Sequence, residues 1–267
     1  INMNSIVKLS FLALFVFFQL TVTSQTAIGE WRDHLPYNRT IRVADVGNSV
    51  YCATNYSIFV YDKEDQSVLR KSKVNGLSDV GISAISYSDA YKTLVIAYTN
   101  TNIDLLKEGR IINLSDIKRR QILGNKTINN ITINDSLAYL SCGFGIVVLD
   151  IKNEEFPEPT YYIGPEGSQV NVLDITFGAD SVYAATFTGI FKAPVSSPNL
   201  ADFNAWTKDT RLYPNLSFNA INFFNNRLFV NNHNEGYSTD TVFMYNYSTH
   251  LWSILPGSTF LNKYRLN

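Results

Sequence analysis

Three histidines are the first residues to consider for catalytic chemistry, because imidazole is the commonest general acid or base near neutral pH. They are His34, His233 and His250, and the sequence places them in three different loops or strand ends. No serine or cysteine nucleophile motif accompanies them. The adjacent Asp33 and His34 could form a catalytic dyad, although a hydrogen-bonded structural pair explains the same two residues. The sequence therefore predicts no catalytic residues and no enzyme.

Metal and cofactor chemistry find equally little support in the residue spacing. The two cysteines, Cys52 and Cys142, have no second pair and no histidine partner at metal-site spacing. They lie in repeats that should not be neighbours, so we expect buried free thiols rather than a disulfide. Gly143-Phe144-Gly145 is predicted to be a hairpin turn, because no helix follows it to bind a phosphate. We expect no metal and no cofactor.

Aromatic residues near short turns are the best candidates for ligand binding. Exposed rings can stack on sugars, and asparagines such as Asn55, Asn100 and Asn232 can hydrogen-bond sugar hydroxyls. This arrangement would suit a glycan. The alternative is that the rings pack against their own hairpins or against the neighbouring sheet. The candidate aromatic residues are Tyr56, Tyr98, Phe144, Phe187 and Tyr237.

These turns belong to a sequence repeat. Each copy has a turn, an apolar run, a second turn and another apolar run, as in NDSLAYLSCGFGIVVLD at residues 134–150. The anchor positions recur roughly every 45 residues, a period typical of four-stranded propeller blades. Apolar residues at successive positions of a run indicate that both faces of each sheet are covered. The anchors are Tyr51, Ile96, Tyr139, Tyr183 and Phe229.

The predicted fold is an all-β propeller with four-stranded blades. Blades are expected to start near residues 41, 82, 128, 172 and 218. Trp206 and Trp252 mark fourth, outermost strands, and Trp31 would supply a fourth strand that closes the ring by strand exchange. Since rings of such blades usually need six to eight, about five blades indicate part of a ring, and we expect a truncated seven-bladed one.

One connection does not follow the repeat clearly. Residues 114–123 have some helical spacing, but the fourth strand of the second repeat should lie near them. We therefore expect a strand or an irregular loop there. The longest basic run of the chain, Lys118-Arg119-Arg120, lies within this segment and is interpreted as a solvated loop.

Composition and the N-terminus place the chain among exported globular proteins. Of its residues, 45% are hydrophobic and 17% charged, with a net charge of −1, so a folded core is expected and nucleic-acid binding is not. Lys8, an apolar stretch from Leu9 to Leu20 and the small residues Val22-Thr23-Ser24 form a predicted signal peptide over residues 1–24, cleaved between Ser24 and Gln25. The propeller would then occupy residues 25–267.

Two motifs carry a family resemblance. Asn75-Gly76-Leu77-Ser78-Asp79, followed by Ile82 and Ile85, resembles the junction of two-component-regulator propeller repeats. The opening Trp31-Arg32-Asp33-His34-Leu35-Pro36-Tyr37, with Val50–Thr54 and Ile58–Asp62, resembles the PorZ-like N-terminal β-propellers of the Bacteroidota type IX secretion system. The resemblance covers Ile28 to about Pro256.

That resemblance implies a surface-exposed, non-enzymatic member of an outer-membrane attachment complex. Its implied partners are the sortase PorU, other attachment-complex proteins and anionic lipopolysaccharide, at the outer membrane or cell surface. The family has two propellers and a C-terminal sorting domain, whereas this sequence ends inside what would be the first propeller. Alternatives are a periplasmic, oligosaccharide-sensing propeller of a hybrid two-component regulator, and a propeller-based hydrolase or lyase.

Three further sites match the Asp-Ser/Thr-apolar pattern that Bacteroidota O-glycosylate. The candidate acceptors are Ser136, Ser181 and Thr241, each preceded by an aspartate and followed by an apolar residue. A tight turn before a strand requires the same residues, so both interpretations remain open.

Overall fold

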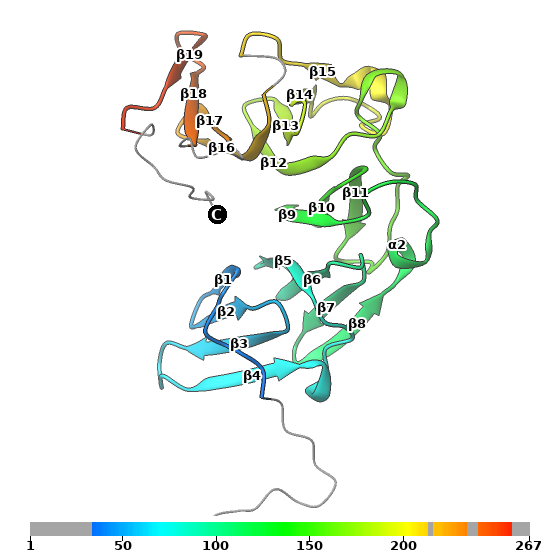
Figure 1. The fold of residues 1–267 in the computed structure, drawn as a ribbon, viewed down its shortest axis with the longest axis vertical. Coiled ribbons are helices and arrows are strands. Elements are labelled where there is room, and N and C mark those ends of the chain that lie inside the picture. Colours follow the sequence, from blue (N-terminus) through cyan, green and yellow to red (C-terminus); the bar gives the residue numbers. More distant parts are fainter. Residues whose placement is uncertain (1–33, 213–215, 234–239, 258–267) are drawn as a thin grey trace, which may run out of the picture. The chain divides into compact units, whose positions relative to one another are not determined.

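The structure is a computed structural model that describes residues 34–212, 216–233 and 240–257. In these ranges the chain forms five antiparallel sheets, each built from consecutive strands (Figure 1). The first sheet contains β1 (Arg42–Val46), β2 (Ser49–Ala53), β3 (Ser57–Asp62) and β4 (Val68–Ser72), and the second contains β5 (Ile82–Ser88), β6 (Thr93–Tyr98), β7 (Ile103–Lys107) and β8 (Arg110–Leu114). The third contains β9 (Ile128–Asn134), β10 (Leu137–Cys142) and β11 (Gly145–Asp150), the fourth β12 (Val172–Gly178), β13 (Ser181–Thr186), β14 (Gly189–Pro194) and β15 (Thr207–Lys208), and the fifth β16 (Phe218–Phe224), β17 (Arg227–Asn232), β18 (Thr241–Asn246) and β19 (Leu251–Ile254).

These sheets are the predicted propeller blades, and each first strand begins within one residue of its expected start. The third blade has only three strands, and two isolated bridges to β11, Ile146 with Tyr161 and Asp150 with Glu155, stand in the place of its fourth. Trp252 lies in β19 and Trp206 directly precedes β15, which confirms that both mark outermost strands. Trp31 and the predicted signal peptide, including Ser24 and Gln25, lie outside the described residues.

The fourth strand of the second blade was predicted too late in the sequence. Glu108 and Gly109 both adopt positive φ angles and form a tight turn directly after β7, so the fourth strand, β8, ends at Leu114. A one-turn helix, α2 (Asp116–Arg119), then occupies the segment expected to be a strand or loop. The remaining helical turns are η1 (Lys73–Asn75), η2 (Pro165–Gly167) and η3 (Phe203–Ala205). Among the described residues, no helix has the length and apolarity needed to cross a membrane.

The blades pack face to face, and their first strands lie next to one another in the order β1, β5, β9, β12 and β16. A separate apolar cluster fills each of the four junctions between consecutive blades. All six residues of β6 are buried, because one face of this strand meets the first blade and the other meets the third. The expectation that both sheet faces are covered is therefore confirmed for this strand.

The register corrects one of the repeat anchors. In three blades the anchor lies three residues before the last residue of the second strand, which pairs with the first strand across a β-bulge. These anchors are Tyr139, Tyr183 and Phe229. The corresponding residue of the second blade is Val95, not Ile96. The turn between β6 and β7 has one more residue than the turn between β10 and β11. The repeat places each anchor at a fixed spacing before the isoleucine that follows the turn, which is Ile103 in the second blade. The longer turn therefore moves the predicted anchor from Val95 to Ile96. Because strand side chains alternate, Ile96 faces the first blade instead of the third.

Both cysteines are free, as predicted. Cys142 is fully buried, and burial raises the pKa of its thiol. Cys52 is only half-buried, so the expectation of a buried thiol is right for Cys142 and wrong for Cys52.

Candidate binding site at the mouth of the central cavity

The first strands line a cavity of about 1200 Å³. In four blades a β-bulge near the start of the first strand leaves one extra residue opposite the second strand. A bulge turns the strand locally and redirects its side chains. The four extra residues all line the cavity, and they are Ser83, Asn129, Leu173 and Asn219.

Polar side chains in this wall connect neighbouring blades. The Asn129 amide donates to the Asn171 side chain (2.9 Å) and to the Val172 carbonyl oxygen (2.6 Å). The Thr132 hydroxyl donates to the carbonyl oxygen of Ile175 at 2.9 Å. These side chains thus bind backbone groups and side chains of the next first strand, which stabilises the cavity wall.

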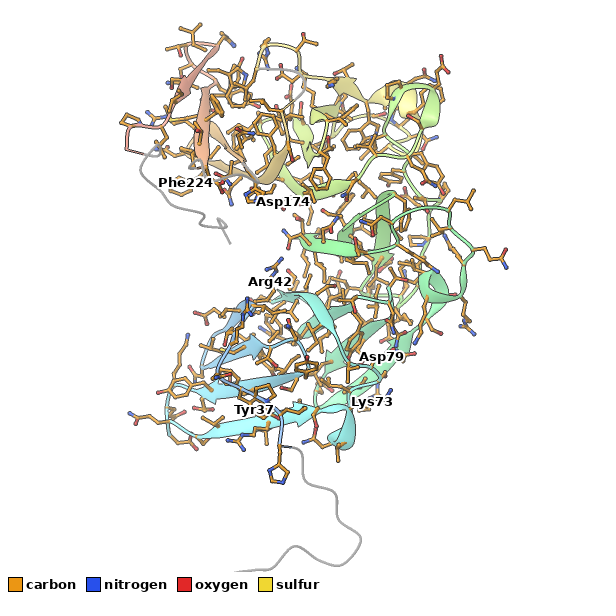
Figure 2. All side chains as sticks on the ribbon, in the orientation of Figure 1. Tyr37, Arg42, Lys73, Asp79, Asp174 and Phe224 are labelled. Atoms are coloured by element: carbon orange, nitrogen blue, oxygen red, sulfur yellow. The ribbon has the colours of Figure 1, made fainter. Side chains whose placement is uncertain are left out.

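Asp174, on β12, is the most connected residue of the wall. One carboxylate oxygen accepts hydrogen bonds from the Asn130 amide (2.7 Å) and the Ile175 amide (2.8 Å), and the other accepts from the Ile221 amide (2.8 Å). It therefore joins the third, fourth and fifth blades. Burial raises the pKa of Asp174 to about 6, although these three hydrogen bonds and the positive charge of Arg42 oppose the rise. Figure 2 shows the side chains of Arg42 and Asp174 directed toward the space between the first strands.

A pH dependence of stability follows from this carboxyl group. Its pKa is higher in the folded chain than in the unfolded chain, so between about pH 4 and pH 6 the folded state binds more protons. The contribution of Asp174 to the free energy of unfolding should therefore fall as the pH rises through this window, by up to about 3 kcal/mol. We expect urea titrations to show that fall in the wild type and to show it reduced in Asp174→Asn. Equal slopes in the two proteins would contradict the assignment.

One end of the cavity combines a cation, amides and an aromatic ring. We define the channel mouth as Arg42, Asn55, Phe187, Asn219 and His233, which all line the cavity. Asn55 and Phe187 lie in turns between second and third strands, and Arg42 and Asn219 lie near the start of first strands, which is the same end of each blade. The Arg42 guanidinium donates to the Asn129 carbonyl oxygen at 3.4 Å, so it reaches from the first blade to the third.

His233 is held in place at the mouth. Its Nδ1 lies 3.1 Å from a carboxylate oxygen of Asp240, which is buried. The Asn231 amide also binds Asp240, at 2.9 Å, and binds the Asn219 side chain at 2.8 Å. The network fixes the positions of His233 and Asn219 relative to each other.

The predicted aromatic face is only partly exposed. Tyr56 and Phe187 are exposed, as expected, and Phe187 lines the cavity. Tyr98 and Phe144 are fully buried, so the prediction that they are surface residues is wrong. Phe144 packs into the apolar cluster between the second and third blades. Tyr237 lies outside the described residues.

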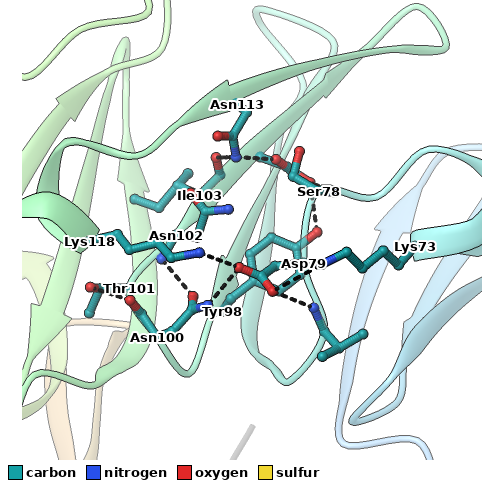
Figure 3. Close-up of polar contacts among 12 residues, drawn as sticks. Lys73, Ser78, Asp79, Tyr98, Asn100, Thr101, Asn102, Ile103, Asn113 and Lys118 are labelled. Carbon is teal, nitrogen blue, oxygen red and sulfur yellow. Dashed lines mark hydrogen bonds and ion pairs between the residues drawn. The ribbon is translucent and has the colours of Figure 1, made fainter.

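Tyr98 is buried because it completes a polar junction between the first two blades (Figure 3). Its hydroxyl donates to Asp104 at 2.6 Å, and the backbone amide of Ser78 and the side chain of Asn113 donate to the same carboxylate, both at 2.8 Å. Asp104 is fully buried. Burial and the hydrogen bond to Asp104 raise the pKa of Tyr98.

The neighbouring Asp79 explains the rest of the Asn-Gly-Leu-Ser-Asp motif. Lys118 Nζ donates to Asp79 at 2.7 Å, and the Asn100 amide donates at 2.6 Å. Burial opposes ionisation of Asp79, but these two donors outweigh it and hold the pKa at about 2. Leu77 of the motif is buried between the blades. The motif is thus a structural junction between the first two blades.

The remaining candidate residues do not converge on one site. His34 is exposed, and Asp33 lies outside the described residues. His250 Nδ1 lies 3.3 Å from the Tyr245 hydroxyl, in the fifth blade. Within residues 34–212, 216–233 and 240–257, no group of three histidine, cysteine, aspartate or glutamate side chains could hold a metal ion.

Ser136, Ser181 and Thr241 are half-buried, and their glycosylation stays a prediction. The aspartate before Ser136 has a positive φ, as a tight turn requires. Asp240, which precedes Thr241, is instead buried against His233, so the turn explanation does not extend to the third site.

Of the channel mouth, Asn55 and Phe187 were predicted from the sequence as ligand-binding residues, whereas Arg42, Asn219 and His233 were not. Arg42 and Asn219 stand at the beginning of first strands, where the repeat pattern marks only apolar residues. Only their position in the repeat could have indicated these two residues. Residues at the start of first strands lie at the same end of each blade as the turns between second and third strands.

Comparisons with known proteins agree with this architecture. A family model described as the PorZ N-terminal β-propeller domain of the type IX secretion system matches residues 50–207. No curated protein matches the sequence. The structure of PorZ from Porphyromonas gingivalis, an essential bacterial surface component of the type IX secretion system, is 26% identical and superposes with a TM-score of 0.73. That match covers 86% of this chain, which spans only 30% of the length of that protein.

Two more distant structures share the fold alone. The extracellular domain of the putative hybrid two-component system BT4673 from B. thetaiotaomicron is 10% identical, with a TM-score of 0.56 over 75% of this chain and 27% of that one. Hydrazine synthase from Kuenenia stuttgartiensis is 12% identical, with a TM-score of 0.60 over 88% of this chain and 70% of that one. Since the family model matches more than half of the sequence, the chain belongs to the family of PorZ N-terminal β-propeller domains of the type IX secretion system.

Proposed function

We propose that this chain is a non-enzymatic, exported binding module of the type IX secretion attachment complex, and that its channel mouth receives the sugar portion of an anionic lipopolysaccharide. Membership of the PorZ propeller family supports a role in this secretion system, and the Porphyromonas relative is a surface component. The partners proposed with it are the sortase PorU and other attachment-complex proteins at the cell surface. No cofactor is proposed.

The observation that carries the ligand proposal is the composition of the channel mouth. The positive charge of Arg42 favours an anionic group, and the exposed ring of Phe187 offers a surface on which a sugar can stack. Amide side chains at Asn55 and Asn219 can hydrogen-bond hydroxyl groups. A cavity wall stabilised by inter-blade hydrogen bonds would keep these groups in place before the ligand binds.

The test measures binding of purified anionic lipopolysaccharide and of a neutral oligosaccharide by calorimetry. Phe187→Ala should weaken both complexes, by about two- to tenfold for one lost aromatic contact. Arg42→Gln should weaken only the anionic ligand. Leu69→Ala, at an exposed residue of the outer strand β4, is the control and should leave both affinities unchanged. Unchanged binding in the Phe187 and Arg42 variants would refute the channel mouth as the ligand site.

The same experiment separates a second candidate function. The fold likeness to the extracellular domain of a hybrid two-component system raises the alternative of an oligosaccharide sensor. A sensor of this kind would bind the neutral oligosaccharide at least as tightly as the lipopolysaccharide, and Arg42→Gln would then have no selective effect.

A further inference from the structure

Two connections between blades meet at Asp79 and bring together a set of basic and apolar side chains. Residues 73–81 connect β4 to β5, and residues 115–127 connect β8 to β9. Lys73 Nζ lies 3.8 Å from one Asp79 oxygen, and Lys118 Nζ lies 2.7 Å from the other (Figure 3). We call the exposed basic and apolar residues of these two connections the basic–apolar patch, and they are Lys73, Val74, Lys118, Arg119, Arg120 and Leu123.

The apolar members of the patch are unusually exposed. Leu123 is 86% exposed, more than any other large hydrophobic residue among those described, and Val74 is 55% exposed. The preceding Ile122 packs against the apolar cluster between the second and third blades. The chain therefore anchors one of two adjacent hydrophobic residues and holds the other in solvent. Exposed apolar side chains beside cations are typical of surfaces that bind a partner.

The connection that carries Leu123 is firmly attached to the blades. Ile117 is buried, and Lys126 Nζ donates to the carbonyl oxygens of Lys118 (2.8 Å) and Arg120 (2.5 Å). The backbone at Asn125 lies so close to Gly143 that a Cβ at that glycine would come within 2.5 Å of the Asn125 carbonyl oxygen. Because both ends of the connection are held, the exposure of Leu123 is a feature of the folded chain rather than of a loose loop.

Charge is distributed unequally between the two faces of the propeller. The patch carries four cations, against which Asp79 and the exposed Asp116 of α2 supply two negative charges, whereas the whole chain has a net charge of −1. The turns at the opposite ends of the strands are rich in exposed carboxylates. They include Glu64, Asp65, Asp89, Glu108, Asp135 and Glu155, which outnumber the exposed cations of the same turns, Lys63, Lys92, Arg110 and Lys152. An anionic surface would therefore attract the patch and repel the opposite face, which would orient the molecule.

We propose that the basic–apolar patch docks this propeller onto the phosphate-bearing surface of an anionic lipid bilayer, with Leu123 and Val74 entering the headgroup region. Basic residues near such a surface each strengthen binding roughly fivefold, and an apolar side chain adds to it by leaving water. Exposed cations beside exposed aliphatic side chains match the surface of such a bilayer, which has charged headgroups outside and an apolar region beneath them. The inference is independent of a ligand at the channel mouth, since the patch residues do not line the cavity.

The test is co-sedimentation of the chain with vesicles at low salt. Vesicles of phosphatidylcholine containing phosphatidylglycerol should bind the wild type, and vesicles of phosphatidylcholine alone should bind it weakly. Arg119→Gln/Arg120→Gln should reduce affinity for the anionic vesicles about 25-fold. Leu123→Ser should reduce it about tenfold, and this loss should persist at higher salt, where the contribution of the arginines is screened.

A matched control makes the same change of charge elsewhere on the second blade. Lys92→Gln/Arg110→Gln removes two exposed cations from the turns on the opposite face. This variant should bind anionic vesicles like the wild type. Equal losses in the two double variants would mean that net charge, not the patch, determines binding, and would overturn the proposal. Failure of the wild type to bind anionic vesicles would overturn it as well and would favour an acidic protein as the partner.

Vesicle binding can fail without affecting the proposed glycan function, because these vesicles contain no sugar. Conversely, Arg119→Gln/Arg120→Gln should leave oligosaccharide binding at the channel mouth unchanged. Circular dichroism of each variant should match the wild type, since every substituted side chain is exposed.

Discussion

Replacing Phe144 with alanine should lower the free energy of unfolding by about 3–5 kcal/mol, the cost of removing a fully buried phenylalanine side chain. Phe144 is completely buried and packs into the cluster between the second and third blades. The lost side chain would leave a cavity within this cluster, to which Ile117 and Leu140 also belong.

Phe187→Ala is the matched control for this prediction, because Phe187 occupies the corresponding turn of the fourth blade but is 44% exposed. Its effect on stability should stay within about 0.5 kcal/mol. Urea denaturation of both variants, followed by circular dichroism, measures the difference. Similar losses in the two variants would show that the two turns are packed alike, contrary to the structure.

The contrast between these two phenylalanines shows what the sequence repeat can predict and what it cannot. The repeat predicted that both lie in turns between second and third strands, and this is correct. It could not predict burial, because burial depends on whether a connection between blades passes over the turn. The segment before β9 passes closely over the turn at Gly143, whereas the turn at Phe187 borders the cavity.

Strand positions were predicted well because they depend on local alternation of apolar runs and turns. All five first strands begin where the repeat indicates, whereas the anchor of the second blade shifts by one residue when a turn gains a residue. The fourth strands are less regular, as β15 has only two residues and the third blade has two isolated bridges in place of a fourth strand. Outermost strands have fewer packing partners, so their sequences are less constrained.

The candidate site was predictable only in kind. An aromatic and amide-rich surface on the face of the turns was expected, and Phe187 and Asn55 belong to the channel mouth. Arg42 and His233 were missed as binding residues, because neither belongs to a motif. They converge through the stacking of five blades, which is a tertiary effect that a single sequence does not display.

Asp104→Ala should be the other strongly destabilising substitution, with a loss of about 3–5 kcal/mol. The fully buried carboxylate accepts from the Tyr98 hydroxyl, the Ser78 amide and the Asn113 side chain. Alanine would leave three donors without their acceptor at the junction of the first two blades, and one of them, the Tyr98 hydroxyl, is fully buried. Asp104→Asn, which keeps the shape and one carbonyl oxygen, should recover part of the loss.

A double-mutant cycle with Tyr98→Phe separates the shared hydrogen bond from simple loss of packing. If the 2.6 Å bond between Tyr98 and Asp104 stabilises the junction, the two substitutions should be less than additive by about 1.5–3 kcal/mol, the range for a hydrogen bond to a charged group. Strictly additive effects would mean that the two side chains act independently.

Asp89→Ala is the control, since this aspartate pairs with Lys92 on the surface of the same blade and its removal should change stability little. A large loss of stability in both aspartate variants would indicate that the carboxylates of this blade act through overall charge. The buried hydrogen bonds of Asp104 would then not explain why the Asn-Gly-Leu-Ser-Asp motif lies between the first two blades.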